Sequence, residues 1–141
     1  MKTVEDILKV KGQNVWAIAP DATVYNALQL MAEKEVGALV VVENERVVGI
    51  ISERDYARKI ILRGRSSVGT PVKDVMTPKV LSVRPDHTVE ECLRLMTSIR
   101  IRHLPVLANN QLLGMVSIGD LVKEVITTGT ITWTSQKQKE S

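Results

Sequence analysis

The sequence predicts an α+β protein made of two β-α-β-β-α repeats, related by a pseudo-twofold axis and packed sheet to sheet. Two observations predict this fold. Without gaps, residues 15–56 align with residues 80–121, and fourteen of the 42 aligned pairs are identical. Each copy also alternates between the hydrophobic spacing of strands and that of helices. Because a few short strands bury little apolar surface alone, we expect the two copies to pack against each other.

Each copy opens with a short strand followed by a helix. The strands are expected over Val15–Ala19 and Val80–Arg84. The sequence Pro-Asp-x-Thr follows each of them and supplies side chains that cap a helix N-terminus. Apolar residues then recur at helical spacing over 24–31 and again over 89–96, which predicts two helices with a buried face.

The rest of each copy reads as a hairpin and a second helix. The apolar runs "GALVVV" and "RHLPVL" predict buried strands, and the polar stretches "ENER" and "ANNQ" predict turns. The third strands, "VVGII" and "LLGMV", lead into helices expected over Asp55–Arg63 and Gly119–Thr127.

These elements divide the chain into four parts. The first repeat is expected over residues 4–63 and the second over 72–127, with a polar linker at 64–71. Residues 128–141 form a polar tail in which we expect little order, although Trp133 is a candidate for docking.

Composition excludes several classes of protein. The 141 residues are 44% hydrophobic and 25% charged, as in a globular protein, and no apolar run approaches the roughly 20 residues of a membrane span. A net charge of +3 is too small to identify a nucleic-acid-binding protein by itself, and an aromatic content of 3% argues against binding of single strands. The N-terminus lacks the features of a signal peptide, so we expect a cytoplasmic protein without membrane contact.

A paired motif suggests a binding site. The stretches "GIISERD" and "GMVSIGD" both end a strand and place an aspartate, Asp55 or Asp120, three residues after Ser52 or Ser117. A carboxylate in the first turn of a helix can accept hydrogen bonds from both hydroxyls of a ribose, and helix N–H groups favour phosphate. The alternative is that Ser-x-x-Asp only caps the helix.

With the repeat, the paired Ser-x-x-Asp motifs and "RIRHLPV" taken together, the chain resembles a tandem pair of cystathionine-beta-synthase (CBS) domains, also called a Bateman module. The resemblance covers residues 4–127. It implies a regulatory, energy-sensing module that binds an adenosine ligand in the cleft between the repeats. AMP is the first candidate, with ADP, ATP, NAD(H) and S-adenosylmethionine as alternatives. It also implies a homodimer, a flat disc of four CBS domains, and a regulated partner protein that no motif identifies.

By this resemblance, the aspartate of one repeat shares a site with the strand start of the other. The nucleotide-binding residues expected around Asp55 are Ser52, Arg54, Thr77, Ile101, Arg102, His103 and Pro105. Those expected around Asp120 are Lys11, Asn14, Trp16, Val36, Gly37, Ala38, Ser117 and Gly119. Trp16 is a candidate to stack on adenine, with packing at an interface as the alternative.

The two expected sites differ in charge and in hydroxyl groups. Arginines cluster around Asp55, so that site is expected to favour a charged nucleotide, whereas Arg58 and Arg63 are expected on a solvated helix face. The resemblance also places a Thr or Ser ahead of the first strand of each repeat. Thr77 fills this position in the second repeat, but the first repeat offers only Lys11 or Asn14.

No catalytic residue, catalytic cofactor or metal site is predicted. Cys92 lies on the buried face of its expected helix, and His87 and His103 lack partners at metal-ligand spacing. We therefore do not expect an enzyme. The alternatives to a nucleotide sensor are a basic nucleic-acid-binding module and a structural dimer without ligand.

Overall fold

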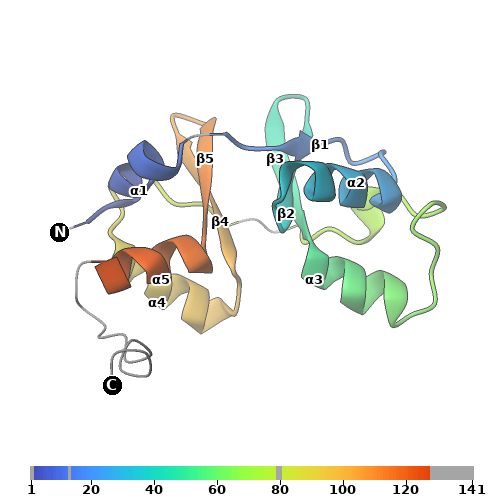
Figure 1. The fold of residues 1–141 in the computed structure, drawn as a ribbon. Coiled ribbons are helices and arrows are strands. Elements are labelled where there is room, and N and C mark those ends of the chain that lie inside the picture. The colour runs from blue at the N-terminus through green and yellow to red at the C-terminus, as the bar shows by residue number, and fades with distance from the viewer. Residues whose placement is uncertain (1, 13, 79–80, 128–141) are drawn as a thin grey trace, which may run out of the picture.

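The computed structural model describes residues 2–12, 14–78 and 81–127. Two halves lie side by side, with the strands of both toward the middle of the molecule (Figure 1). Each half holds a small sheet and helices, which confirms the predicted α+β fold of two repeats. The polar tail and Trp133 lie outside the described residues.

The first half contains a three-stranded sheet and a long helix. Strand β1 (Ala17–Ile18) pairs in parallel with β2 (Ala38–Glu43), which pairs antiparallel with β3 (Arg46–Ser52). Helix α2 (Val24–Lys34) begins after Thr23, whose hydroxyl accepts a hydrogen bond from a backbone N–H of the first turn. The sequence-predicted cap therefore starts this helix.

The second half repeats this arrangement with a two-stranded sheet. Strands β4 (His103–Ala108) and β5 (Gln111–Ser117) form an antiparallel pair, flanked by α4 (Val89–Ile99) and α5 (Ile118–Thr127). In the expected strand 80–84, Val83 forms an isolated parallel bridge with β4, and residue 80 is outside the described residues. Among the described residues, no helix has the length and apolarity that crossing a bilayer requires.

The backbone follows the sequence repeat closely. Both hairpins carry a register shift after the fourth residue of their first strand, and both turns use two residues with positive φ. Helices α2 and α4 each end in the left-handed region, at Glu35 (φ 56°) and Arg100 (φ 57°). Such matching detail indicates that the repeat specifies local geometry as well as element order.

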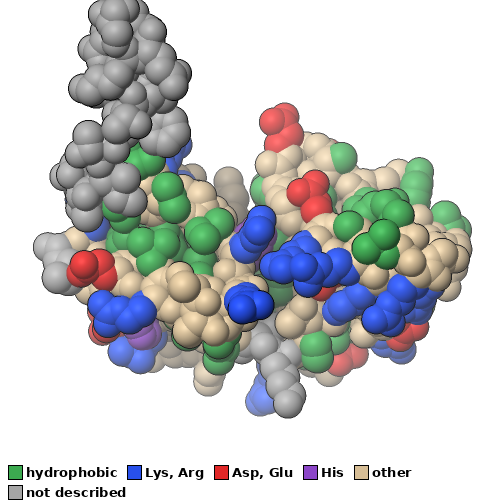
Figure 2. All heavy atoms as spheres, turned by 90° about the horizontal axis from the view of Figure 1, so that it is seen from below, with side chains coloured by type: hydrophobic (Ala, Val, Ile, Leu, Met, Phe, Trp, Pro, Cys, Tyr) green, Lys and Arg blue, Asp and Glu red, His purple; other side chains and the backbone are tan. Residues whose placement is uncertain are grey.

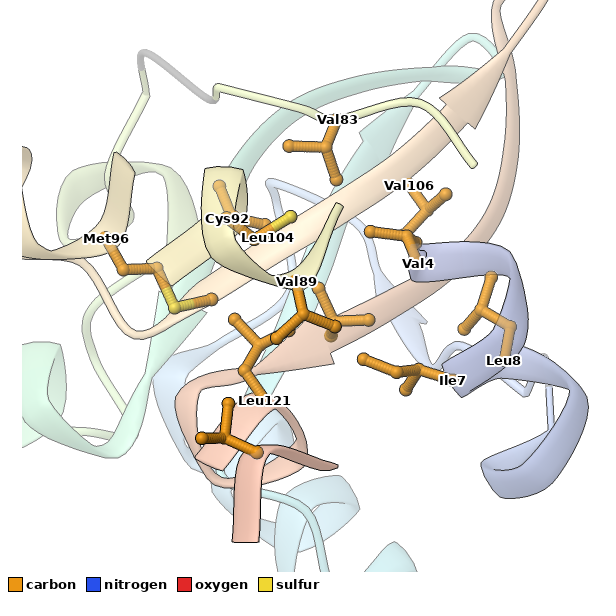
Figure 3. Close-up of a cluster of buried hydrophobic side chains, with 12 residues drawn as sticks. Val4, Ile7, Leu8, Val83, Val89, Cys92, Met96, Leu104, Val106 and Leu121 are labelled. Atoms are coloured by element: carbon orange, nitrogen blue, oxygen red, sulfur yellow. The ribbon is translucent and has the colours of Figure 1, made fainter. Parts of the chain in front are cut away.

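The segment at the start of each repeat packs into the opposite half. Helix α1 (Val4–Lys11) starts the first repeat, yet its residues Val4, Ile7 and Leu8 point into the second half's core (Figure 3). Val4, Ile7 and Leu8 are at most 5% exposed there. The N–H of Val4 also donates to the carbonyl of His87 at 2.9 Å. We call this helix the first crossing segment.

The second crossing segment, residues 70–77, makes the reciprocal contact. It contains the 3-10 turn η2 (Val72–Asp74), and the side chains of Val72 and Val75 are fully buried in the first half's core. The N–H of Val72 donates to the carbonyl of Ala22 at 2.7 Å. Separating the halves would expose apolar residues of both crossing segments.

The helix after β3 differs from the prediction at both ends. It was expected over Asp55–Arg63, but α3 (Glu53–Tyr56) begins directly after the capping residue Ser52. It continues as a π-helical turn, η1 (Ala57–Ile61), and the N–H of Leu62 donates to the carbonyl of Ala57. Such wide turns are rare in helices and occur frequently at functional sites.

Cys92 is fully buried in the second core, as predicted. Burial, with a smaller contribution from Glu91, raises the pKa of its thiol to about 11. The neutral thiol therefore packs as a small apolar group.

Candidate ligand-binding site between the two halves

A cavity of about 770 Å³ lies between the halves, and both contribute to its walls. Its lining residues are Gly37, Ile50, Ser52, Glu53, Arg54, Asp55, Arg58, Lys59, Thr77, Leu81, Arg100, Ile101, Arg102, His103, Ser117 and Ile118. Seen from below, Lys and Arg side chains gather where the halves meet (Figure 2). This volume falls within the range of small-molecule sites.

Asp55 is fixed by a reciprocal cap at the start of α3. Its Oδ2 accepts hydrogen bonds from the backbone N–H of Ser52 at 3.0 Å and from the Ser52 hydroxyl at 3.1 Å. The Ser52 Oγ in turn accepts from the N–H of Asp55 at 3.2 Å. The capping role considered from the sequence is therefore real, and one carboxylate oxygen fulfils it.

The other oxygen of Asp55 meets groups from farther along the chain. Its Oδ1 lies 3.4 Å from the hydroxyl of Thr77 and 3.4 Å from the ammonium of Lys59. Lys59, in the π-helical turn, also donates to the carbonyl of Val75 at 2.9 Å. Asp55 is only 9% exposed, so these contacts hold a carboxylate that would be costly to bury alone.

The second crossing segment brings Thr77 to this carboxylate. Thr77 pairs with Ile50 of β3 through two backbone hydrogen bonds, of 2.8 and 3.0 Å. The neighbouring residue of the strand is Gly49, where an added Cβ would lie 2.6 Å from the Met76 sulfur and 3.0 Å from the Thr77 carbonyl oxygen. The glycine therefore allows the segment to approach the strand closely enough to build the cavity wall.

The cavity walls carry an excess of positive charge. Five basic side chains line it, against the two carboxylates of Glu53 and Asp55. The basic residues are Arg54, Arg58, Lys59, Arg100 and Arg102. Arginine binds carboxylate or phosphate through paired donors, so the walls suit an anionic ligand. Arg58, which was expected on a solvated helix face, is indeed exposed, and its side chain also lines the cavity.

His103 occupies the start of β4, near both motif aspartates. Its pKa is lowered first by burial and then by the positive charge of Lys11, while the nearby Asp120 opposes the shift. Smaller effects come from Arg102, which lowers the pKa, and Asp55, which raises it. The imidazole is therefore neutral at pH 7 and can act as a hydrogen-bond donor and acceptor.

Asp120 has the same cap as Asp55 but a different neighbour. Its Oδ2 accepts from the N–H of Ser117 at 2.8 Å, and its own N–H donates to the Ser117 hydroxyl. The same oxygen lies 2.7 Å from the ammonium of Lys11, which also donates to the carbonyl of Met115 at 2.9 Å. Burial raises the pKa of Asp120, but the hydrogen bonds from Lys11 and Ser117 outweigh it, so the pKa lies below the ordinary value.

The structure gathers part of the predicted set around this one cavity. The predicted residues that line the cavity are Ser52, Arg54, Asp55, Thr77, Ile101, Arg102 and His103, together with Gly37 and Ser117 from the set expected around Asp120. Those that do not line it are Lys11, Asn14, Trp16, Val36, Ala38, Pro105, Gly119 and Asp120. Nucleotide contacts by either group stay a prediction.

Packing explains why several of these residues lie elsewhere. Pro105 and Ala38 are buried within their strands, and Trp16 packs against the first core with the Lys34 ammonium 4.4 Å from its ring centre. Trp16 therefore contributes to the surface of the first half in this structure.

Seven residues that line the cavity were not among the predicted binding residues. They are Ile50, Glu53, Arg58, Lys59, Leu81, Arg100 and Ile118. Lys59 could have been found from its position four residues after Asp55, a spacing at which a helix pairs opposite charges. The apolar residues carry no such signal, because an isolated isoleucine or leucine at a strand end is equally typical of a core.

A family model and a similar known protein place the chain in the same family. The model of the CBS domain matches residues 4–62 and 72–127. The "CBS domain-containing protein CBSX3, mitochondrial" of Arabidopsis thaliana is 46% identical over 88% of this chain. The chain spans 65% of the length of that relative.

Solved structures agree in fold. A protein from Burkholderia ambifaria MC40-6, described as a candidate signal-transduction protein with CBS domains, is 48% identical with a TM-score of 0.87, over 93% of this chain and 98% of its own. The CBS domain pair of protein MJ0100, solved with 5′-methylthioadenosine and S-adenosyl-L-methionine, has a TM-score of 0.80 at 20% identity. The match covers 93% of this chain and 99% of that pair, and at this identity it establishes the shared fold alone.

Proposed function

The chain belongs to the CBS-domain family, whose domain pairs are regulatory modules, and we propose from this that its cavity binds an adenosine nucleotide to regulate a partner protein. One observation carries the proposal. A buried carboxylate, Asp55, and an excess of basic side chains line a single cavity to which both repeats contribute.

The lining supplies a partner for each part of such a ligand. The carboxylate of Asp55, with Thr77 beside it, would accept the hydroxyls of the ribose. Arginines such as Arg54 and Arg102 would hold the phosphate through paired donors. Four apolar side chains would surround the adenine, namely Ile50, Leu81, Ile101 and Ile118. The adenosine ligands of MJ0100 give a precedent for this fold.

AMP is the first candidate ligand, with ADP, ATP and NAD(H) as alternatives. All of them carry an anionic phosphate, which the five basic residues of the wall would neutralise. S-adenosylmethionine, one of the ligands named for MJ0100, lacks a phosphate. The basic wall therefore favours a nucleotide over a sulfonium ligand in this chain.

Regulation follows from the position of the cavity. A ligand that contacts Asp55 in one half and Arg102 in the other would hold the halves in one relative arrangement. If a partner protein binds that arrangement more tightly, ligand and partner become coupled, typically by about 1–3 kcal/mol. We propose this sensing role rather than catalysis.

A calorimetric titration of AMP, ADP, ATP and NADH tests the proposal. Asp55→Ala should weaken binding of the best nucleotide at least tenfold, because a hydrogen bond to a charged group contributes about 1.5–3 kcal/mol. Asp120→Ala removes the same kind of helix cap outside the cavity and is the matched control. Wild-type affinity in the Asp55→Ala protein would show that the site is assigned wrongly.

Nucleic-acid binding is the second candidate, favoured by the same basic residues and a sequence pI near 9.1. Binding of a duplex through phosphate contacts should fall steeply between 50 and 200 mM salt. Binding of a single nucleotide in the cavity, which makes few phosphate contacts, should fall far less, so the salt dependence separates the two functions.

The homodimer and the location remain predictions from the sequence. A dimer could cover apolar side chains that are exposed at the end of η1, where Ile61 is 56% and Leu62 is 77% exposed. Such exposure favours association. The Arabidopsis relative is named as mitochondrial, so the family is not tied to the cytoplasm.

A further inference from the structure

We propose that the side chain of Lys11 blocks the site expected around Asp120, which the repeat relates to the site at Asp55. Each chain then binds one adenosine ligand rather than two. The inference rests on the proposed function, because it concerns how many of the two related sites can accept the ligand.

The repeat defines which atoms correspond. Residues of the second repeat lie 65 positions after their counterparts, so Met115 corresponds to Ile50 and Asp120 to Asp55. In the first site, the carbonyl of Ile50 accepts the backbone N–H of Thr77 at 2.8 Å. In the second, the carbonyl of Met115 accepts the side-chain ammonium of Lys11 at 2.9 Å. The ammonium therefore takes the place of a backbone donor.

The same ammonium also binds the carboxylate. Asp55 has the Thr77 hydroxyl and the Lys59 ammonium at 3.4 Å, whereas Asp120 has the Lys11 ammonium at 2.7 Å. The Lys11 contact is the shortest of the three and is charge-assisted, so it is the strongest. A ribose that entered the second site would need this carboxylate, and it would first have to displace Lys11.

Helix α1 holds Lys11 at this position. Val4, Ile7 and Leu8 anchor the helix in the second core, and Lys11 is the last residue of the helix. Gly12, with φ 95°, then ends the helix, and its N–H donates to the carbonyl of Leu8 at 2.8 Å. A cation is favoured at a helix C-terminus, so the backbone supports the charge where the side chain reaches Asp120.

The Lys11–Asp120 contact can compete with a ligand for the carboxylate, yet its removal should cost the fold little stability. The side chains of Lys11 and Asp120 are 36% and 24% exposed, and partly exposed ion pairs contribute little to folding. Replacing Lys11 with the similarly long, uncharged methionine should therefore free Asp120 while the fold remains intact.

Calorimetry with AMP tests the inference on the wild-type chain, Lys11→Met and Lys11→Met/Asp55→Ala. Lys9→Met, an exposed change on the same helix, is the matched control. We expect one AMP per chain for wild type and the control, and two for Lys11→Met. The double variant should keep the newly opened site alone. Two AMP per wild-type chain, or one per Lys11→Met chain, would overturn the inference.

Two further outcomes distinguish a failure of this inference from a failure of the proposed function. Loss of AMP binding in Lys11→Met would mean that Lys11 is a phosphate ligand, which also overturns the inference. Absence of AMP, ADP, ATP and NADH binding in every protein would refute the proposed function, and the one-ligand inference with it. A carboxylate titration by NMR separately checks the contact: the pKa of Asp120 should rise in Lys11→Met and stay unchanged in Lys9→Met.

Discussion

The carboxylates of Asp55 and Asp120 begin matching helices with matching caps, yet they meet different crossing segments. Asp55 faces Thr77 of the second crossing segment and lines the cavity, while Asp120 is bound by Lys11 of the first and does not line it. The repeat therefore determines where each carboxylate lies, and the segment from the opposite half determines what it can bind.

The crossing segments differ because their sequences differ. The first is an eight-residue helix with a reciprocal cap at Thr3 and a lysine at its end. The second forms only the three-residue turn η2 before Thr77 pairs with β3. A helix presents a long side chain to its site, whereas the extended segment presents its backbone and a short hydroxyl. Variants of each segment test this difference between the two sites.

The largest effect is expected for Leu8→Ala, which weakens the first crossing segment. Leu8 is 3% exposed in the second core, and such truncations cost about 2–5 kcal/mol in the free energy of unfolding. Urea denaturation measures this loss. Val10→Ala on the same helix, where the side chain is 89% exposed, is the control. Equal stability of the two variants would show that α1 is not anchored as described.

A smaller effect is expected for Gly49→Ala and Gly114→Ala, which crowd the two crossing segments at equivalent strand positions. Overpacking of this kind typically costs about 1–3 kcal/mol. A Cβ at Gly49 would lie 3.0 Å from the backbone oxygen of Thr77, whereas one at Gly114 would lie 2.8 Å from the end of the Leu8 side chain.

The two glycine variants should differ in ligand binding. Gly49→Ala should lower AMP affinity, because it displaces Thr77 at the cavity, and Gly114→Ala should leave that affinity near wild type. Calorimetry measures the affinities and thermal unfolding the stabilities. Equal losses of affinity would contradict the division of roles between the segments.

The smallest effect concerns His103, which lies near both motif aspartates. Burial, Lys11 and Arg102 lower its pKa against the opposing effect of Asp120 and Asp55. The imidazole of the unfolded chain therefore binds a proton more readily than that of the folded chain. The contribution of His103 to the free energy of unfolding is fully present above pH 6.5 and is lost as the pH decreases. The slope from one such group is at most about 1.4 kcal/mol per pH unit.

His103→Gln should remove this part of the pH dependence. Urea denaturation between pH 5 and 8 measures the slope in both proteins, and an NMR titration of the wild-type imidazole measures the pKa directly. An imidazole pKa at or above 6.5 would contradict the burial of His103.

Much of the fold could be predicted from the sequence because local patterns encode it. Thr23 and Thr88 cap the two long helices, and the paired turns fall where polar residues interrupt the apolar strands. The caps formed by Ser52 with Asp55, and by Ser117 with Asp120, were likewise visible as a spacing of three residues. Each of these features depends on residues close together in the chain.

Tertiary structure alone decided which carboxylate lines the cavity. The exchange of crossing segments and the contact of Lys11 with Asp120 leave no local pattern. The Lys11–Asp120 contact joins residues 109 positions apart, and it depends on α1 packing into the half that does not follow it in sequence. Hydrophobic burial is non-directional, so periodicity predicts which face of a helix is buried but not which core receives it.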